Sequence, residues 1–377
     1  MRQTIARVKA TAIAVPINFA QFGDDRVRPN SMCLAEVETE NGAIGHGITS
    51  ITQGTVIAKI INDVAGPSIL GADAMAIERV WQNLYWTLTP WGQSGQGSHA
   101  IAAIDLALWD IKGKILGEPL WKLVGGANDR IEAYATCGFS FFDHDQLADA
   151  TRTMVNQGYR AVKMQVGRPG LDRRNSTTTL AEMIDEDVKR VTTVREAVGP
   201  NIEVSVDAGC RLDLPSAVEL ARRLEPLNIA CFEEPIMQND VHLLAEMRRR
   251  TTIALSAGQN EGQSYRFRDM LVAGAVDIVQ PNAIITGGMT SCLKIAGMAA
   301  AFNTPISNGG GCPYHNMHLQ AGVANGTSIE YQLNSAGACQ MIFDGLPEIK
   351  DGWVQLPDAP GLGFSPNAAA IAEYTVE

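Results

Sequence analysis

The sequence predicts an α/β protein in which a closed parallel barrel follows a smaller α+β domain. After Gly126, eight short runs rich in β-branched residues recur along the chain, and helical stretches separate most of them. This alternation is typical of a parallel barrel, in which functional groups lie at the carboxyl ends of the strands. A chain of 377 residues also exceeds one ordinary compact domain. The eight runs are residues 131–137, 160–166, 202–208, 229–235, 253–258, 276–281, 304–308 and 328–332.

The part before the barrel is expected to begin with strands and continue with helices. The first 21 residues contain an apolar stretch that Thr11 and Pro16 interrupt, which we interpret as a strand and not a signal peptide. A second strand is predicted at 32–39, and the glycines of 41–47 are expected in turns. Helical periodicity covers 74–88 and 98–116, and glycine and proline follow the second stretch.

Within the barrel, helices are expected at 214–224 and 290–302, among others. An open doubly wound sheet is the structural alternative. It is disfavoured because no glycine-rich dinucleotide loop follows any of the eight runs.

Composition narrows the possible partners. The formal net charge is −11, which disfavours nucleic acid and anionic membrane surfaces as partners. No run is long enough to span a bilayer. The seven cysteines include no C-x-x-C pair, and Cys137, Cys231 and Cys292 lie in apolar stretches. We therefore expect buried free thiols in a reducing cytoplasm.

Acidic residues follow three consecutive predicted strands. Asp207 closes one run, Glu233 and Glu234 close the next, and Gln259 and Glu261 follow the third. In a barrel these side chains would meet around one mouth, where oxygen ligands favour Mg²⁺ or Mn²⁺. Alternation directs one of the two adjacent glutamates away from the metal, and we expect this of Glu234.

Lys163 lies one strand earlier, also near a strand end. A cation that binds a carboxylate stabilises the charge formed when the neighbouring proton is removed. A lysine near a dication has a lowered pKa and is a better base. The pattern therefore indicates removal of a proton next to a carboxylate.

These motifs resemble the mandelate racemase and muconate-lactonizing branch of the enolase superfamily. The resemblance rests on the lysine strand, the DAG, EEP and GQN strand ends, PNAIITGG, and the helix AIAAIDLALWDIKGKILGEPLWKLVGG. It implies a modified (β/α)7β TIM barrel at 129–355. It also implies an α+β capping domain at 1–128, to which 356–377 returns. It further implies bound Mg²⁺, with Mn²⁺ as an alternative, and a homo-oligomer.

Carried over by position, the resemblance implies Asp207 and Glu233 as metal ligands. Gln259 occupies the place of a third ligand that is usually a carboxylate. We favour Glu261 as its substitute, because a negative ligand binds Mg²⁺ better than a neutral amide, and both remain candidates. Glu330 matches a glutamate that hydrogen-bonds the substrate carboxylate.

The sequence departs from the family at its usual bases. Gln165 replaces a second lysine, Asn282 stands where the family has an aspartate, and the partner histidine position falls near Gly309. His315 is our candidate for the vacated acid–base role. Tyr314 is a weaker candidate, and His318 is expected to be a structural helix histidine.

Other residues are candidate substrate contacts. The resemblance places two capping-domain loops, 17–28 and 45–52, over the active site. Polar amides at the mouth can hydrogen-bond sugar hydroxyls. The loop after the Lys163 strand carries three arginines that could reach a distal carboxylate. The loop candidates are Phe19, Phe22, Arg26 and His46; the amides are Gln165, Asn260, Asn282 and Asn308; the arginines are Arg168, Arg173 and Arg174.

The function we expect is dehydration of a sugar acid, an aldonate or aldarate, to a 2-keto-3-deoxy acid. Losing both usual bases weakens the case for a racemase, which needs a base on each face. Two alternatives remain. One is a racemase, epimerase or cycloisomerase on the same scaffold, and the other is a non-catalytic barrel that binds an acidic ligand.

Overall fold

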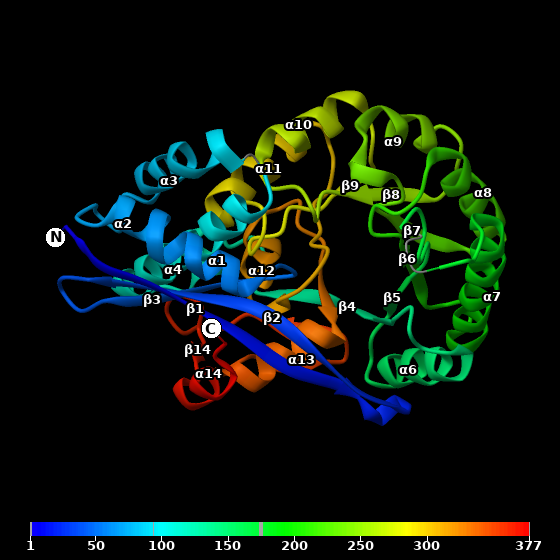
Figure 1. The fold of residues 1–377 in the computed structure, drawn as a ribbon, viewed down its shortest axis with the longest axis horizontal. Coiled ribbons are helices and arrows are strands. Elements are labelled where there is room, and N and C mark those ends of the chain that lie inside the picture. The colour runs from blue at the N-terminus through cyan, green and yellow to red at the C-terminus, as the bar shows by residue number, and fades with distance from the viewer. Residues whose placement is uncertain (1, 93, 173–175, 377) are drawn as a thin grey trace.

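The chain folds into a capping part and a barrel, seen in a computed structural model that describes residues 2–92, 94–172 and 176–376 (Figure 1). The capping part holds a three-stranded antiparallel sheet in the order β1-β2-β3. Its strands are β1 (Ile5–Phe19), β2 (Asp24–Thr39) and β3 (Ile44–Ser50), and a 3₁₀ turn (Ala20–Phe22) joins the first two. Its helices are α1 (Gly54–Ile60), a π-helical turn (Ile61–Ala65), α2 (Gly66–Ile69), α3 (Ile77–Gly92), α4 (Gln96–Leu116) and α5 (Leu120–Leu123).

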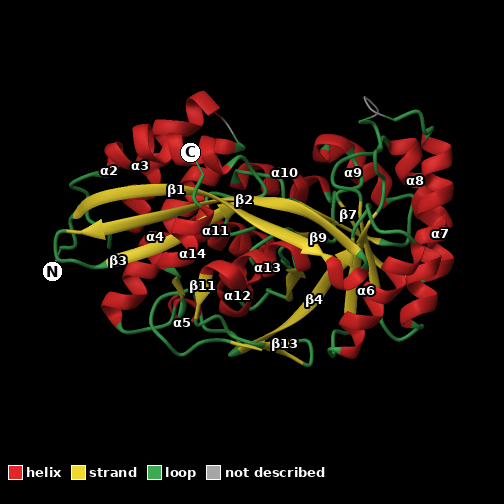
Figure 2. Cartoon of the chain, turned by 60° about the horizontal axis from the view of Figure 1, so that its bottom comes forward, coloured by secondary structure: helices red, strands yellow, loops and turns green. Residues whose placement is uncertain are grey.

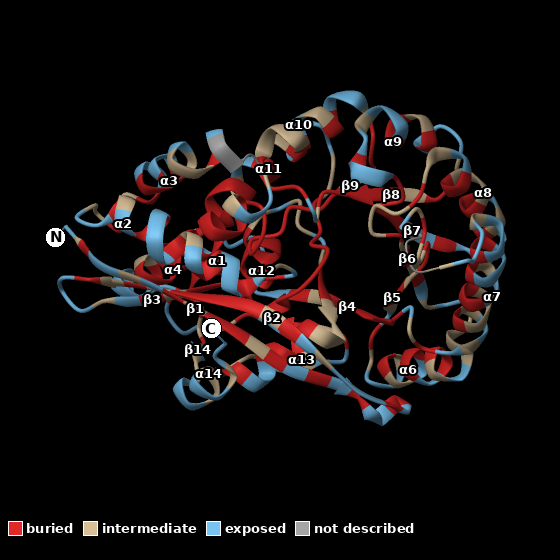
Figure 3. Cartoon of the chain, in the orientation of Figure 1, coloured by how far each residue is buried: buried red, intermediate tan, exposed pale blue. Residues whose placement is uncertain are grey.

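Helix α4 is the packing centre of the capping part. It is buried along almost its whole length, as Figure 3 shows, and it ends at Gly117 in the left-handed conformation. Gly45 and Gly47 lie in β3 against this helix, and a Cβ on either would approach a carbonyl oxygen of α4 within 2.1 Å. The prediction that the glycines of this stretch mark turns holds for Gly42, which lies between β2 and β3, but was wrong for Gly45 and Gly47, because close packing of strand on helix requires them.

The barrel strands run parallel from β4 to β9, and β10 pairs with β4 to close the sheet. The seventh predicted strand is reduced to isolated bridges of Ile306 with Val279 and Gly326. The strands are β4 (Arg130–Gly138), β5 (Ala161–Gln165), β6 (Glu203–Asp207), β7 (Ile229–Glu233), β8 (Ala254–Ala257), β9 (Ile278–Val279) and β10 (Ser328–Gln332).

Helices cover the outside of the barrel; those within residues 144–273 have exposed outward faces (Figure 3), whereas the helix over residues 313–322 is buried at every position. Capping boxes begin two of them, formed by Asp143 with Gln146 and by Thr179 with Glu182. The helices are α6 (His144–Asn156), α7 (Leu180–Val198), α8 (Leu214–Leu224), α9 (Val241–Arg248), α10 (Ser264–Ala273), α11 (Gly288–Ala301), α12 (Pro313–Gly322) and α13 (Leu333–Ile342). Two 3₁₀ turns lie at Glu225–Leu227 and Met237–Asn239.

The C-terminal segment contacts both the barrel and the capping part. β13 (Trp353–Gln355) pairs with β4 and with β12 (Ile349–Lys350), while β11 (Phe343–Asp344) pairs with β14 (Ser365–Pro366). Helix α14 (Ala368–Tyr374) then lies beside β1 (Figure 1), where Val376 N donates to Ala12 O. The division at residues 128 and 356 stays a prediction.

The β1–β2 hairpin joins the two parts. It is long, and its turn extends past the capping helices toward the barrel, where it meets α6 (Figure 2). Phe19 and Phe22 pack there with Phe139 and Phe142, which follow strand β4. The hairpin therefore docks on the barrel rim through aromatic contacts.

Candidate active site

Lys163 lies between two carboxylates inside the barrel. Its Nζ is 2.6 Å from Glu233 Oε2 and 2.9 Å from Glu330 Oε1. All three side chains are at most 3% exposed. They come from β5, β7 and β10, so closure of the barrel brings together residues far apart in the sequence.

One buried ammonium therefore faces two buried carboxylates. Burial alone would lower the pKa of Lys163, but the charges of Glu233 and Glu330 raise it well above its usual value. Burial raises the pKa of Glu233 to about 8, although Lys163 opposes this shift. Lys163 is thus a cation in this arrangement, and a further cation beside Glu233 would favour the charged form of that carboxyl group.

Asp207 and Gln165 lie level with Glu233 across neighbouring strands. The register pairs Gln165 with Asp207 and Asp207 with Glu233. Asp207 Oδ1 accepts from Gly209 N at 2.7 Å, and Arg168 approaches Oδ2 at 4.0 Å. Parallel strands thus carry two carboxylates side by side at their carboxyl ends, as predicted.

Gln259 completes this group from the end of β8. A Cβ on Gly309 would lie 2.6 Å from Gln259 Oε1 and 2.7 Å from Glu233 Oε1. Both oxygens therefore border the same small space. Glu233 Oε1 is buried and has no hydrogen-bond partner among the described residues. An unpartnered buried carboxylate oxygen beside an amide oxygen is a suitable place for a hard cation.

Glu261, which we favoured as the third ligand, already has charged and polar partners. Its Oε2 accepts from Arg266 Nε at 3.0 Å, and Asn239 Nδ2 donates to its Oε1 at 3.3 Å. A carboxylate that is already ion-paired has less to offer a metal. The oxygens that lie together at the strand ends are those of Asp207, Glu233 and the amide of Gln259. Among residues 2–92, 94–172 and 176–376, no group of three or more His, Cys, Asp or Glu is placed to hold a metal ion.

Glu234 faces away from this group, as alternation predicts. It accepts from Asn239 Nδ2 at 3.0 Å and from Asn260 Nδ2. Its backbone φ of 42° is left-handed, so the chain turns sharply straight after Glu233. The two adjacent glutamates thus have separate surroundings.

Asn282 and Asn308 brace the backbone of the site. Asn282 Nδ2 donates to Gly309 O at 2.7 Å and Gly310 O at 2.8 Å, and its Oδ1 accepts from Asn316. Asn308 Oδ1 accepts from the backbone N of Glu330 at 3.2 Å. Both side chains are fully buried. The Asn282 amide thus holds the glycine corner, whereas Asn308 Nδ2 is buried without a hydrogen-bond partner among the described residues, and a substrate contact by Asn308 stays a prediction.

His315 does not face Lys163. Its ring lies in edge contact with Phe343 and Phe364, at centroid distances of 5.3 and 5.0 Å. Burial lowers its pKa to about 3, so the imidazole is neutral. The facing acid–base role assigned to His315 is therefore corrected to a packing role among apolar rings.

The two residues near His315 also lie outside the Lys163 cluster. His318 Nε2 lies 3.1 Å from Leu362 O, which agrees with a structural helix histidine. Tyr314 is buried, and its hydroxyl accepts from Gln340 at 3.2 Å.

The candidate substrate contacts on the β1–β2 hairpin contact other residues of the protein. Phe19 and Phe22 are buried in the aromatic contacts described above. Arg26 donates to both oxygens of Asp24, each at 2.8 Å. We therefore withdraw Phe22 as a substrate contact, and Arg26 is held by a neighbour on its own hairpin. Of the loop arginines, Arg168 lies near Asp207, whereas Arg173 and Arg174 lie outside the described residues.

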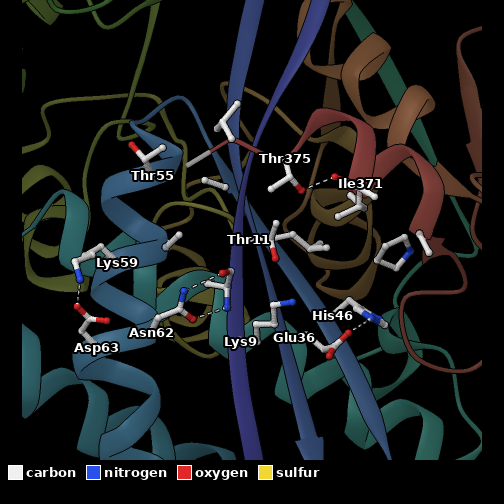
Figure 4. A pocket seen from close by; sticks show the side chains of 18 residues that line it. Lys9, Thr11, Glu36, His46, Thr55, Lys59, Asn62, Asp63, Ile371 and Thr375 are labelled. Atoms are coloured by element: carbon white, nitrogen blue, oxygen red, sulfur yellow. Dashed lines mark hydrogen bonds and ion pairs between the residues drawn. The ribbon is translucent and has the colours of Figure 1, made fainter.

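His46 was also wrongly assigned to the active site. It lies in β3, where its Nε2 is 3.4 Å from Glu36 Oε2 (Figure 4). Both line a pocket of about 790 Å³ bounded by the capping sheet, α1 and the C-terminal segment. No barrel strand contributes to the lining of this pocket. The side chain of His46 therefore points away from the site.

Three residues near the site were not singled out from the sequence. Gln280 Nε2 donates to Glu233 Oε2 at 2.8 Å, and Thr136 Oγ1 donates to Glu330 Oε1 at 2.5 Å. Side chains two residues apart on a strand face the same side. The candidate Asn282 could therefore have indicated that Gln280 faces the barrel interior. Ile51 ends the capping loop with a φ of 61°, and its Cδ1 lies 2.7 Å from the Cβ position of Gly310.

A barrel with a capping domain and a carboxylate site at its strand ends defines a class of carboxylate-processing enzymes. The chain belongs to the mandelate racemase / muconate lactonizing enzyme family. The N-terminal domain of that family matches residues 1–125, and the enolase C-terminal domain-like model matches residues 146–370. The predicted family and barrel class are therefore confirmed.

Named relatives fall into more than one reaction type. Arabinonate dehydratase of Saccharolobus solfataricus is 30% identical, over 92% of this chain and 91% of its own. A 3,6-anhydro-alpha-L-galactonate cycloisomerase of Streptomyces coelicolor is 32% identical, over 88% of each chain. The structure of L-talarate dehydratase from Polaromonas sp. JS666, complexed with Mg and L-glucarate, has a TM-score of 0.85 and 27% identity. It covers 99% of this chain and 98% of that one.

Among the residues that the structure describes, no helix is both long and apolar enough to cross a bilayer.

Proposed function

We propose that this protein is a Mg²⁺-dependent dehydratase that converts an aldonate or aldarate to a 2-keto-3-deoxy acid. The observation that carries the proposal is the placement of Lys163 between Glu233 and Glu330, beside the unpartnered Glu233 Oε1. The named dehydratases among the relatives support the same reaction class.

Asp207, Glu233 and Gln259 would hold the cation. Their donors are all oxygens, which Mg²⁺ and Mn²⁺ both accept. When bound, the cation would stabilise negative charge on the substrate carboxylate during proton removal. Gln259 contributes no charge, so we expect weaker binding than at a site of three carboxylates.

Lys163 would handle the proton. In the observed arrangement Lys163 is an ammonium and stabilises negative charge on the substrate. A cation held beside Glu233 would offset the charge that keeps Lys163 protonated, and the neutral amine would then be a base for the proton next to the carboxylate. The ammonium formed on Lys163 would return this proton to the hydroxyl at the next carbon, which leaves as water, and the resulting enol tautomerises to the 2-keto-3-deoxy acid.

Two more accessible amides are further candidate contacts for sugar hydroxyls. Gln165 lies level with Asp207 and is partly exposed, and Asn260 is exposed beside the site. Gln165 Oε1 accepts from Ser140 N at 3.1 Å, which leaves its NH₂ group available as a donor.

A cycloisomerase is the second candidate, supported by the cycloisomerases among the relatives. A racemase is less well supported. Asn282 and Gly309 occupy the expected positions of the second base, and His315 is packed away from the site. A cytoplasmic homo-oligomer is part of the proposal as well, and size-exclusion chromatography would test the assembly.

The first experiment is a screen of four-, five- and six-carbon mono- and diacid sugars with Mg²⁺, in which semicarbazide detects 2-keto-3-deoxy acids. We expect one or a few substrates, with turnover abolished in Lys163→Ala and Glu233→Gln. Glu261→Gln is the control and should retain activity. If the set yields no product although Mg²⁺ binds, the screen is repeated in D₂O. Exchange without water loss would favour a racemase or cycloisomerase, and no exchange would favour a binding protein.

A further inference from the structure

A cavity of about 440 Å³ lies inside the barrel on the opposite side of Lys163 from the strand ends that carry Asp207. We call it the lower cavity. Its lining comes mainly from the first residues of the strands, and Lys163, Glu233 and Gln280 also border it. The lower cavity therefore reaches the active-site cluster from the amino-terminal end of the barrel.

Exposure shows where the lower cavity opens. Arg160, Asn201 and Glu203 border it and are exposed, whereas Ser205 and Cys231 are intermediate. The deepest residues are buried; Lys163, Glu233 and Gln280 are each 2% exposed. Access thus decreases from the amino-terminal rim toward the active-site cluster.

The wall is unusual for a barrel interior. Such interiors are normally filled by layers of bulky branched side chains. Here the wall includes small residues, several with hydroxyl groups, which leave space unfilled. They are Ala133, Ala161, Ser205, Cys231, Ser256 and Ser307. A roomy polar cavity of this kind holds water, unlike an apolar one, which stays dry.

Gln280 points to a specific water position. Its Nε2 donates to Glu233 Oε2 at 2.8 Å, while its Oε1 is buried without a hydrogen-bond partner among the described residues. Leaving a buried amide oxygen unsatisfied is costly, so a donor is needed there. The side chain borders the lower cavity, from which solvent can supply that donor.

We propose that the lower cavity is a hydration site filled from the amino-terminal end of the barrel, and that its water donates to Gln280 Oε1. The water fixes the Gln280 amide, which in turn positions Glu233. Gln280 is thus a positioning residue. The effect of Gln280 on metal binding rests on the proposed function. Solvent access to the lower cavity does not rest on it.

Two native thiols test access. Cys231 lines the lower cavity, whereas Cys137 is fully buried in β4, and burial raises the pKa of each to about 12. Because the two thiols have similar pKa values, a difference between their labelling rates reports a difference in access from solvent. We expect methyl methanethiosulfonate to modify Cys231 at least tenfold faster than Cys137 in the folded protein, as located by peptide mass spectrometry. Equal rates would overturn the proposal.

A filling variant tests the direction of entry. Ala161 lies two residues before Lys163 and lines the same cavity. Ala161→Leu should slow Cys231 labelling at least fivefold, with circular dichroism confirming the fold. An unchanged rate would show that the reagent does not pass through the lower cavity, and would overturn entry from the amino-terminal end.

The positioning role is tested by metal affinity. Gln280→Met keeps the size of the side chain but removes both hydrogen bonds, and we expect about tenfold weaker Mg²⁺ binding by calorimetry. An unchanged affinity would refute the positioning role. If the parent protein binds no Mg²⁺, the proposed function fails, and the Cys231 result still decides whether the lower cavity is hydrated.

Discussion

At the residue scale, the third metal ligand depends on which side chain already has a charged partner. Gln259 Oε1 borders the same space as Glu233 Oε1, whereas Glu261 is paired with Arg266. We predict that Gln259→Ala weakens Mg²⁺ binding at least about tenfold, while Glu261→Gln changes it less than about twofold. Isothermal titration calorimetry on the two variants decides the matter. The reverse order would restore Glu261 as the ligand.

The buried ring of His315 gives a second prediction at this scale, on activity. If it only packs against Phe343 and Phe364, His315→Phe should keep kcat/KM within about threefold for the substrate found in the screen. A loss of more than about a hundredfold in a correctly folded variant would mean that His315 acts in catalysis.

The same ring predicts acid sensitivity. An unfolded histidine binds a proton near pH 6.5, but His315 in the fold does so only near pH 3. Acid therefore favours the unfolded state, and stability present above pH 6.5 is lost as pH falls toward 3. Between pH 6.5 and 5 this amounts to about 2 kcal/mol. Urea unfolding measures how far the free energy of unfolding decreases between these two pH values. The decrease should be smaller by about this amount in His315→Phe than in the parent protein. An equal decrease in both proteins would contradict the assignment.

At the element scale, Asp105 links the capping helix α4 to the barrel helix α11. Its carboxylate accepts from Thr290 Oγ1 at 2.6 Å and from Thr290 N at 2.9 Å. We predict that Asp105→Ala lowers the free energy of unfolding by about 2 kcal/mol, because it leaves buried donors unsatisfied. Burial raises the pKa of Asp105 to about 7, so the neutral isostere Asp105→Asn should cost less. Urea denaturation at pH 7 compares them, and equal losses would argue against this link.

At the scale of the whole molecule, metal binding should stabilise the fold. A ligand that binds only the native state adds about 2.7 kcal/mol at a hundred times its Kd. We predict that Mg²⁺ raises Tm in a concentration-dependent way relative to EDTA, and that Glu233→Gln removes the effect. Scanning fluorimetry measures both. A parent Tm that does not respond to Mg²⁺ would contradict the metal site.

Sequence patterns predicted most elements and fewer of the site contacts. Helix α8 matches its predicted bounds, and Lys163, Asp207 and Glu233 lie at or near strand ends as expected. These features depend on local periodicity, which sequence displays directly. The seventh strand was overestimated, because a short apolar run does not reveal that it forms only isolated bridges.

By itself, the sequence determined the barrel class and the order of acidic residues along it, because parallel strands separated by helices place their carboxyl ends around one mouth. Only the tertiary structure decided which polar groups are free to act. Arg266 pairs with Glu261, Phe343 and Phe364 enclose His315, and the capping sheet turns His46 toward Glu36. The contacts of His315 depend on elements distant in sequence, the pairing of His46 with Glu36 on the register of the neighbouring strands β2 and β3, and the pairing of Glu261 on the direction of a turn after β8. No spacing of residues along the chain specifies them.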